Sequence, residues 1–244
     1  MIQKKGVPFP LIKTDGHPCP YFPSRTAAEL MVLTHQVTTE AYEGLMAQGF
    51  RRSESYLYRP DCKDCRACVP IRIPVESFCL SKSQRRVLKN NSDLVLKIGK
   101  PTFDRQRYEM YERYQLFKHR GTMSCTEEQY QKLFCSSPVD TLEMSYWLKG
   151  QLLGLGIVDV CRNAMSSVYF SFEPEQVSRS LGVYSALCEI EECRRNKKAY
   201  WYLGYYVEHC SKMDYKTRFG PHEFFKEGQG WSCPERGGKV APDR

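Results

Sequence analysis

Three cysteines with the spacing of metal ligands stand in the first third of the sequence, at Cys62, Cys65 and Cys68. The pattern Cys-x2-Cys-x2-Cys lets three thiols meet in one tight loop, and thiolates at this density suit Zn²⁺ or an iron–sulfur cluster. A fourth ligand could come from Cys19, Cys79 or His17. Buried thiols without a ligand are the alternative. The pattern favours a metal over that alternative and leaves the fourth ligand open.

A basic stripe follows the cysteines. Four cations recur at i, i+3, i+4 and i+7, which places them on one face of a helix: Lys82, Arg85, Arg86 and Lys89. Like charges at this spacing destabilise a helix slightly, so a phosphate backbone lying along the stripe explains it better than stability does. A solvated face is the alternative, although such faces usually mix both signs. We expect nucleic acid here, through contacts that do not depend on base sequence.

Polar side chains alternate along one segment of the second half. Strand alternation across 167–173 puts Ser167, Tyr169, Ser171 and Glu173 on one face, opposite Val168, Phe170 and Phe172. Asp159 closes another strand whose remaining inward residues are apolar. Each of these groups alone is more simply explained as a structural polar residue. Together they predict one wall of a cleft.

Aromatic and basic residues interleave between 202 and 221. Tyr205 lies in an aromatic run, and three cations follow it at Lys212, Lys216 and Arg218. This mixture suits stacking on a terminal base beside phosphate contacts. An aromatic core strand followed by a solvated helix is an equal alternative.

Hydrophobic periodicity indicates the elements that must position these residues. Helices are expected at 26–48, 82–91 (capped by Ser81), 105–117 and 181–195, with a further short helix near the end. Strands are expected at 50–58, 69–75, 93–100, 142–148, 152–160, 167–172 and 199–206, with one more after the last helix.

An antiparallel meander, a helix and a further strand together outline an α+β acyltransferase fold of the GNAT kind, with an antiparallel-dominated mixed sheet flanked by helices. In that fold the donor sits where the central strands splay apart. We expect a cysteine-bearing, basic region at 1–100, the GNAT-like domain at 101–234 and a flexible tail at 235–244. At the start of the 181–195 helix, Arg179 and Gly182 match the loop that holds the coenzyme A pyrophosphate, but the bulky Tyr184 stands where a small residue belongs.

Bulk properties agree with a polyanionic partner. The formal net charge is +8, and residues 51–100 hold 12 Lys and Arg against 5 Asp and Glu. No apolar run approaches the roughly 18–20 residues of a membrane span, and the first residues do not form a secretory signal. We therefore expect a cytoplasmic protein without a membrane partner, whose 12 cysteines are reduced thiols or metal ligands.

Taken together, eight segments resemble one family closely, the arginyl/leucyl-tRNA–protein transferases, and within it the bacterial aspartate/glutamate leucyltransferase branch. The matching segments are Cys19-Pro-Tyr, Gly49-Phe-Arg-Arg, Tyr58-Arg-Pro-x-Cys62-x2-Cys65-x2-Cys68-x-Pro-x-Arg72, Ser81-x-Ser-Gln-Arg-Arg86, Ser180-Leu-Gly-Val-Tyr184, Tyr202-Leu-Gly-Tyr-Tyr206, Lys212-Met-Asp-Tyr-Lys216 and Phe219-x-Pro221.

The resemblance implies a GNAT-type enzyme that transfers leucine from Leu-tRNA to proteins with N-terminal Asp or Glu and so marks them for degradation. Arginyl transfer and acyl-CoA-dependent acyl transfer are the enzymatic alternatives, and a zinc-bearing RNA-binding module is the non-catalytic one. Arginyl members carry a Cys-x2-Cys and a Cys-Cys pair for an iron–sulfur cluster, but here Phe22 and Arg66 take the second positions. A cluster or zinc ion would instead use Cys19, Cys62, Cys65 and Cys68.

The proposed reaction assigns roles to the remaining residues. It needs no metal and no covalent intermediate, because the donor is an activated ester. Asp159 or Glu173 would anchor or relay the proton of the incoming amine, and Tyr169 would serve the leaving hydroxyl. The acceptor's carboxylate would be held by Arg72, Arg85 or Arg86. The residues expected to contact tRNA are Lys82, Lys89, Tyr205, Lys212, Lys216 and Arg218.

Overall fold

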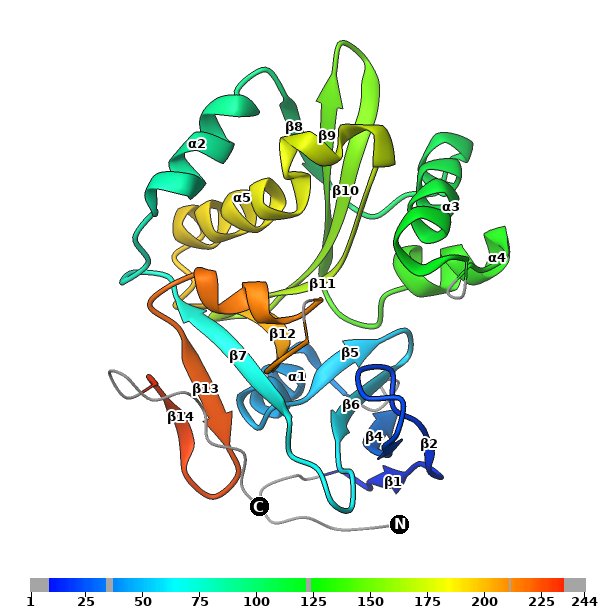
Figure 1. Cartoon of the computed structure of the whole chain (residues 1–244), viewed down its shortest axis with the longest axis vertical. Coiled ribbons are helices and arrows are strands. Elements are labelled where there is room, and N and C mark those ends of the chain that lie inside the picture. Colours follow the sequence, from blue (N-terminus) through cyan, green and yellow to red (C-terminus); the bar gives the residue numbers. More distant parts are fainter. Residues whose placement is uncertain (1–8, 34–36, 122–123, 211, 235–244) are drawn as a thin grey trace.

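One large mixed sheet organises the chain. The computed structural model describes residues 9–33, 37–121, 124–210 and 212–234. Within them, eight strands pair in the order β14-β13-β7-β12-β11-β10-β9-β8, and only β11 and β12 run parallel (Figure 1). The strands are β7 (Cys68–Pro74), β8 (Val95–Gly99), β9 (Thr141–Leu148), β10 (Gln151–Val160), β11 (Ala164–Phe172), β12 (Tyr200–Val207), β13 (Glu223–Lys226) and β14 (Gly230–Ser232).

Helices cover both faces of this sheet (Figure 1). On one face lies α5 (Leu181–Arg195), with α2 (Lys82–Asn90) packed against it. Against the other face lie α3 (Arg105–His119), α4 (Glu127–Tyr130) and the π-helical turn η2 (Gln131–Cys135). This arrangement confirms the predicted α+β class, an antiparallel-dominated mixed sheet flanked by helices with one parallel pair at its centre.

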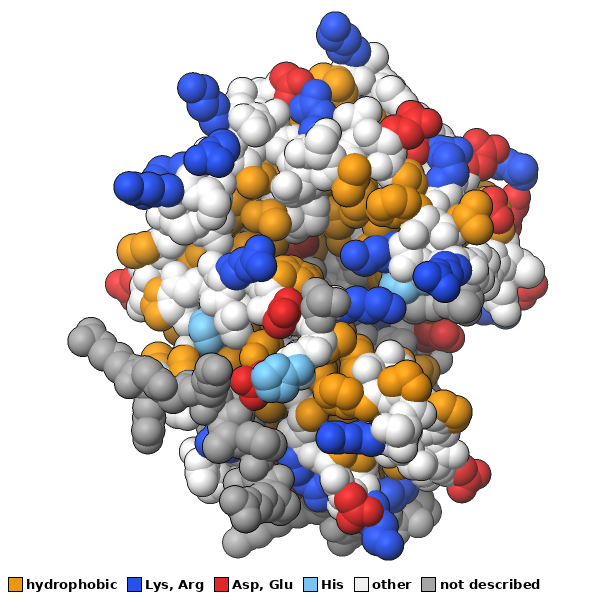
Figure 2. Space-filling model, viewed as in Figure 1, with side chains coloured by type: hydrophobic (Ala, Val, Ile, Leu, Met, Phe, Trp, Pro, Cys, Tyr) orange, Lys and Arg blue, Asp and Glu red, His pale blue; other side chains and the backbone are white. Residues whose placement is uncertain are grey.

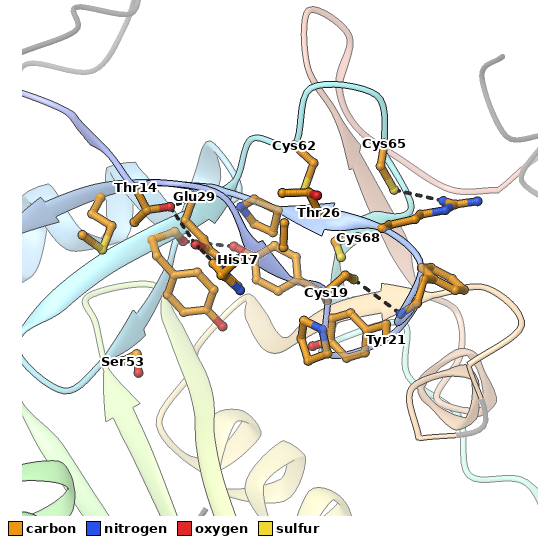
Figure 3. A pocket seen from close by; sticks show the side chains of 18 of the residues that line it. Thr14, His17, Cys19, Tyr21, Thr26, Glu29, Ser53, Cys62, Cys65 and Cys68 are labelled. Carbon is orange, nitrogen blue, oxygen red and sulfur yellow. Dashed lines mark hydrogen bonds and ion pairs between the residues drawn. The ribbon is translucent and has the colours of Figure 1, made fainter.

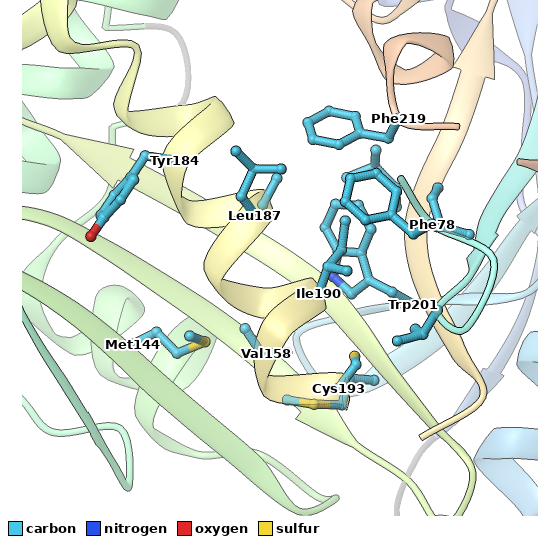
Figure 4. Packing of buried hydrophobic residues seen from close by; sticks show 14 of the residues in the cluster. Phe78, Met144, Val158, Tyr184, Leu187, Ile190, Cys193, Trp201 and Phe219 are labelled. Atoms are coloured by element: carbon cyan, nitrogen blue, oxygen red, sulfur yellow. The ribbon is translucent and has the colours of Figure 1, made fainter. Parts of the chain in front are cut away.

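Local sequence signals explain several of these elements. Lys149 and Gly150 both adopt positive φ, 48° and 87°, in the two-residue turn between β9 and β10, as a tight hairpin turn requires. Ser81 and Gln84 form a reciprocal capping box at the start of α2, which confirms the expected cap. The apolar stripe of α5 packs into the main core, where Leu187 and Ile190 lie between two groups of buried side chains (Figure 4).

A second, smaller sheet forms the N-terminal part. Its strands pair in the order β1-β4-β6-β5, beside α1 (Thr39–Ala47) and a two-stranded β2-β3 ribbon. The strands are β1 (Ile12–Lys13), β2 (His17–Pro18), β3 (Thr26–Ala27), β4 (Glu29–Leu33), β5 (Arg51–Ser53) and β6 (Tyr56–Pro60). A separate hydrophobic cluster joins α1 to the small sheet and to the start of β12.

The helix expected at 26–48 is wrong in its first half. Leu30 and Val32 are both fully buried at strand alternation in β4, whereas Leu33, which fits helical spacing, is 40% exposed. The helix begins only at Thr39, where the Thr38 hydroxyl accepts a hydrogen bond from the Ala41 amide. A short apolar run satisfies both periodicities, and pairing with β6 decided between them.

The boundary expected at residue 100 cuts across the large sheet. Both β7 and β8 lie before that residue, yet β7 pairs with β12 and β13, and β8 pairs with β9. The small sheet ends at Pro60, so the first region is shorter than predicted. The expected tail at 235–244 lies outside the described residues. Among the described helices, none has the length and apolar character to cross a bilayer.

Candidate active site

The two parallel central strands separate soon after they meet. Their pairing runs only from Ala164 opposite Tyr200 to Ser166 opposite Tyr202. Beyond it, β12 carries a bulge against β7, and Gly204 adopts a φ of 83°. The parted strands leave backbone groups that no neighbouring strand satisfies. This splay is the place where the predicted fold positions its donor.

Two buried cations occupy the splay. Arg51, from β5, donates through Nη2 to the carbonyl of Ser167, the first residue of β11 beyond the pairing. Lys216, from the 3₁₀-helix η4 (Asp214–Arg218), donates through Nζ to the carbonyl of Tyr205 on β12, at 2.8 Å. A Cβ on Gly204 would lie 3.3 Å from Lys216 Nζ and 3.9 Å from Arg51 Cζ. Both cations therefore lie beside Gly204, and each is bonded to a different strand of the splay.

A buried carboxyl group lies near these cations. Glu189 of α5 accepts hydrogen bonds from Trp201 Nε1 at 2.9 Å and from the hydroxyl of Ser185 at 3.1 Å. The Ser167 hydroxyl lies 3.4 Å from the same carboxylate. Burial raises the pKa of Glu189 to about 7 and is the largest influence on it, and burial likewise lowers the pKa of Lys216 to about 7.

A β-bulge changes the face on which the predicted polar residues lie. The β10–β11 register shifts so that Ile157 opposes Tyr169 while Val158 opposes Ser167, which leaves Val168 as the extra residue. Ser167 then points to α5, whereas Val168 and Tyr169 pack against the α3–α4 cluster. The single polar face expected at 167–173 is therefore wrong. Gln115 donates to the Tyr169 hydroxyl, whose pKa burial raises far above its usual value.

Asp159 lies in a buried ion pair rather than on a cleft wall. Its two oxygens accept from Arg52 Nε at 2.7 Å and Nη2 at 2.8 Å, and also from the hydroxyls of Tyr42 and Thr141. It is fully buried, so the incoming amine expected at this carboxylate does not fit the geometry. Glu173 is also paired, with Arg113 at 2.6 Å. An ammonium at Glu173 would have to compete with that guanidinium.

Three residues expected to bind substrate carboxylate or tRNA are already engaged within the protein. Arg72 donates to Glu223 at 2.7 Å and lies 3.7 Å from the ring centroid of Tyr200, so it is not a free carboxylate ligand. Tyr205 is buried, and its hydroxyl donates to the carbonyls of Gly49 and Tyr58, so stacking on a tRNA base is ruled out there. The predicted tRNA contact at Lys216 is corrected for the same reason, because this residue is 7% exposed.

The basic stripe of α2 is exposed as predicted. Gln84 is the buried residue of the helix, and its amide donates to the Arg218 carbonyl. The four cations of the opposite face are exposed, and within the described chain they make no ion pair: Lys82, Arg85, Arg86 and Lys89. Figure 2 shows Lys and Arg side chains projecting over α2. Lys212 and Arg218 are exposed near η4 and keep their predicted availability to a polyanion.

The four predicted metal ligands line one cavity of about 390 Å³ between the small sheet and β12 (Figure 3). The cavity is also lined by Tyr58 and Tyr205. Burial raises the pKa of Cys68 to about 12, and the nearby thiols add to the rise. However, no three metal-ligating side chains among the described residues are grouped closely enough to hold an ion. The Cys65 thiol instead accepts from Arg25, so the cysteines converge on one cavity without forming a ready-made metal site.

Arg51 and Glu189 are functional candidates that sequence reasoning did not assign. Arg51 stands in the segment Gly49-Phe-Arg-Arg. Neighbouring side chains of a strand point to opposite faces, so one of two adjacent arginines would face the interior, where arginine is rare. Glu189 interrupts the apolar stripe of α5 next to Ile190. Both signals were visible, but only the tertiary structure brings the two residues to the splay.

Comparisons with known proteins identify relatives along most of the chain. The family model "Arginine-tRNA-protein transferase, N terminus" matches residues 17–86, and its C-terminal counterpart matches residues 106–226. A protein of Marinobacter nauticus named aspartate/glutamate leucyltransferase is 39% identical over 218 residues, 88% of this chain and 92% of that protein. Another of the same name from Pseudoalteromonas atlantica is 40% identical over 220 residues, covering 89% and 94%.

Solved structures give only distant likenesses. FemX aligns with a TM-score of 0.46 at 10% identity, over 76% of this chain and 65% of that one. L-PGS from Bacillus licheniformis aligns with a TM-score of 0.43 at 9% identity, over 68% and 50%. At these scores the likenesses carry no inference about function.

Proposed function

The chain belongs to the arginine-tRNA-protein transferase family, and from this premise we propose that it transfers leucine from Leu-tRNA to the N-terminal Asp or Glu of acceptor proteins. The observation that carries the proposal is the consistent name of relatives at 39% and 40% identity over nearly the whole chain. The product carries a new N-terminal leucine and is thereby marked for degradation.

The chemistry asks little beyond positioning. The donor is an ester, and an α-amine has a pKa of about 8, so a sizeable fraction of acceptor is already neutral at neutral pH. The protein has to bring the amine to the ester carbonyl, accept one proton and stabilise the oxyanion. No covalent intermediate on the protein is required. We assign this step to the splay between β11 and β12, where the sheet opens beside buried cations.

The tRNA is assigned to the exposed cations. The α2 stripe presents Lys82, Arg85, Arg86 and Lys89 on one face, and α2 packs against α5, whose first turn lies near Phe170 of β11. A phosphate backbone along α2 would thus approach the same end of the sheet. Arg218 lies beside the same helix, because its carbonyl accepts from Gln84 on the face of α2 opposite the stripe.

Arginyl transfer is the second candidate, because both family models carry the arginine name. Leucyl transfer is preferred, since the relatives that match at 39% and 40% identity are named for leucine. Coenzyme A is disfavoured at the start of α5. Arg179 there is engaged with Asp93 at 3.0 Å, and the bulky Tyr184, which stands where a coenzyme A loop carries a small residue, packs against Tyr146 in the main core.

The decisive experiment gives the protein Leu-tRNA or Arg-tRNA, each labelled in the amino acid, with a peptide that begins with Glu. We expect the leucine label to move to the peptide and the arginine label to stay on its tRNA. A peptide that begins with Gln is the matched control and should be labelled far more slowly than the Glu peptide. Transfer of arginine alone would replace the proposal by its arginyl form, and transfer of neither label would refute both.

No step of this reaction is assigned to a metal. The cavity that contains Cys19, Cys62, Cys65 and Cys68 is where a zinc ion or an iron–sulfur cluster would bind, but the first three of these thiols have other hydrogen-bond partners. We propose that transfer proceeds without metal chemistry. Transfer rates should therefore survive a chelator that lowers the metal content of the protein, measured on the same sample by elemental analysis.

A further inference from the structure

We propose that Arg51 and Lys216 bind the side-chain carboxylate of the acceptor's first residue and so select Asp and Glu. This inference rests on the proposed function and names the residues that give it specificity. Arg51 had no predicted role and Lys216 was predicted to contact tRNA, and both lie in the splay where the reaction is placed.

The first observation is an unmet hydrogen-bond donor. Arg51 is only 6% exposed, and its Nη2 donates to the Ser167 carbonyl. Its Nη1, by contrast, is buried and has no hydrogen-bond partner within the described part of the chain. A buried cationic donor without a hydrogen-bond partner destabilises the folded protein. A bound ligand that accepts this hydrogen bond would explain why such a donor is kept.

The second observation is the imbalance of charge. Arg51 and Lys216 both lie next to Gly204, and each donates to a carbonyl, which is a neutral acceptor. The neighbouring Glu189 is already bound by Trp201 and Ser185, and its raised pKa leaves it partly protonated near neutral pH. Burial and the neighbouring Arg51 lower the pKa of Lys216 to about 7, so this residue is itself only partly charged near neutral pH. An added anion would offset the charge of Arg51 and favour the charged form of Lys216.

The position of the pair relative to the cavity favours a small carboxylate. Tyr58 and Tyr205 both line the 390 Å³ cavity, and the charge of Arg51 lies near enough to offset part of the rise that burial causes in the pKa of each. Arg51 therefore lies close to two tyrosines of the cavity wall, and Lys216 is bonded to the backbone of one of them, although neither cation lines the cavity itself. A carboxylate on a short side chain is small enough to be enclosed beside them, whereas an RNA backbone is served by the exposed stripe on α2.

Geometry links carboxylate binding to catalysis. Only one methylene in Asp, or two in Glu, separates the carboxylate from the carbon that carries the reactive α-amine. Holding the carboxylate at Arg51 Nη1 and Lys216 Nζ would thus fix the amine beside the splay. The corresponding amides, Asn and Gln, would leave both cations without an anion and should be rejected.

The pair has a simpler alternative role, as a cap for the two carbonyls that the splay leaves unpaired. Lys198 performs that role elsewhere, since its Nζ donates to the carbonyls of Cys161 and Arg162 at 2.8 and 3.2 Å. It serves as the control for Lys216. Arg59, a buried neighbour in the small sheet that donates to the Gln48 carbonyl and to Glu227, serves as the control for Arg51.

The test compares wild-type protein with Lys216→Met, Arg51→Met, Lys198→Met and Arg59→Met. Leucine transfer is measured on peptides that begin with Glu and with Gln. For Lys216→Met and Arg51→Met we expect kcat/KM for the Glu peptide to fall about 100-fold, with little change for the Gln peptide, so that discrimination collapses. The two controls should keep the wild-type ratio between the peptides, and all variants should bind Leu-tRNA within about twofold of wild type.

Two results would overturn the inference. Equal losses on both peptides would show that the cations only cap carbonyls, and a loss of tRNA affinity with intact discrimination would assign them to phosphate. If Arg51→Met does not fold, Arg51→Lys is used in its place, because it keeps the charge but lacks the second terminal nitrogen of the guanidinium. The ratio of kcat/KM between the Glu and Gln peptides is then measured for that variant.

A binding measurement separates this inference from the proposed function. Without tRNA, the Glu peptide should raise the Tm of the wild-type protein, the Gln peptide should not, and Lys216→Met should abolish the shift. Equal shifts with both peptides, or a shift that survives in the variant, would refute the carboxylate site. A wild-type protein that shows the selective shift but transfers no leucine would refute the proposed function and leave the carboxylate site supported.

Discussion

The cations of this protein lie in two contrasting settings. On α2, Lys82, Arg85, Arg86 and Lys89 are exposed and make no ion pair among the described residues. At the junction of the small sheet and the splay, Arg51, Arg52 and Lys216 are each less than 9% exposed, and each has defined hydrogen bonds. The same residue types are thus used in opposite ways within one chain.

The difference separates recruitment from selection. Exposed charges act over roughly 8–10 Å, are screened by salt, and attract any polyanion that approaches. Buried cations act only on groups that reach them, but there each contact is short and geometrically specific. The exposed stripe is therefore suited to a long RNA, and the buried group to a small feature of the acceptor.

The contrast between buried and exposed cations is tested most strongly by removing one partner of the buried ion pair between Arg52 and Asp159. Arg52→Ala leaves Asp159 buried without its guanidinium, and we expect a loss of about 3–5 kcal/mol in the free energy of unfolding, measured by chemical denaturation. Replacing both residues, as Arg52→Met with Asp159→Leu, should recover part of that loss. A cost below about 1 kcal/mol for the single change would mean that this pair behaves like a surface pair.

The pH dependence of stability gives the next largest effect. Burial raises the pKa of Glu189 from its usual 4.5 to about 7, so the folded protein retains a proton that the unfolded chain releases between these values. The stabilisation that comes from this retained proton is fully present below pH 4.5 and is lost as the pH rises through about 7. Between these two values the free energy of unfolding should fall by roughly 1.4 kcal/mol per pH unit.

Glu189→Gln should therefore remove about 2 kcal/mol of the fall in stability between pH 5 and pH 7, read from denaturation curves at both pH values. Glu191→Gln, which changes an exposed carboxylate on the same helix, is the control and should leave the pH profile unaltered. An unchanged profile in Glu189→Gln would show that the buried carboxyl is ionised throughout.

The exposed stripe is tested through salt dependence. The double change Arg85→Gln and Arg86→Gln removes two phosphate contacts, so the slope of log K for tRNA against log salt should fall by about 1.4–1.8. Affinity should drop about tenfold at moderate salt, with Tm nearly unchanged. Arg105→Gln with Lys132→Gln, two exposed cations of α3 and η2, should have no such effect. If the control variant lowered the salt slope as much as the change at Arg85 and Arg86 does, the RNA would follow no defined path along α2.

The smallest effect is expected at a pair of intermediate exposure. Arg113 is half-exposed and binds Glu173 at 2.6 Å. Arg113→Ala should cost about 1 kcal/mol or less in chemical denaturation, because water can partly replace the guanidinium. It also tests the catalytic role predicted for Glu173, since freeing this carboxylate should raise leucine transfer if Glu173 binds the incoming amine. An unchanged rate would remove that role.

The parts of the fold that the sequence predicted well depend on local signals. The meander of β9 to β11 follows from alternating strands and the Lys149-Gly150 turn, and α5 follows from its apolar stripe. The segment at 29–33 was misread because its periodicity fits a strand and a helix alike. Only pairing with β6, a contact distant in sequence, decides it.

The candidate site was harder to predict for the same reason. One extra residue, Val168, places Tyr169 on the face of the sheet opposite Ser167, and the local sequence does not predict such a bulge. Arg51, Glu189 and Lys216 come from a strand, a helix and a 3₁₀ turn that meet only in the folded protein. Sequence reasoning identified the exposed stripe, where spacing on one helix suffices. Of the buried group it singled out Lys216, as a tRNA contact, and it missed Arg51 and Glu189.

The place of β7 in the large sheet has a consequence for how the protein is made. Both of its neighbours, β12 and β13, follow it in the chain by more than a hundred residues. During synthesis β7 therefore emerges long before either partner, with two unpaired edges that invite wrong pairing. The central sheet can close only when the last strands have left the ribosome, so we expect early translation stops to yield aggregation-prone fragments rather than smaller folded proteins.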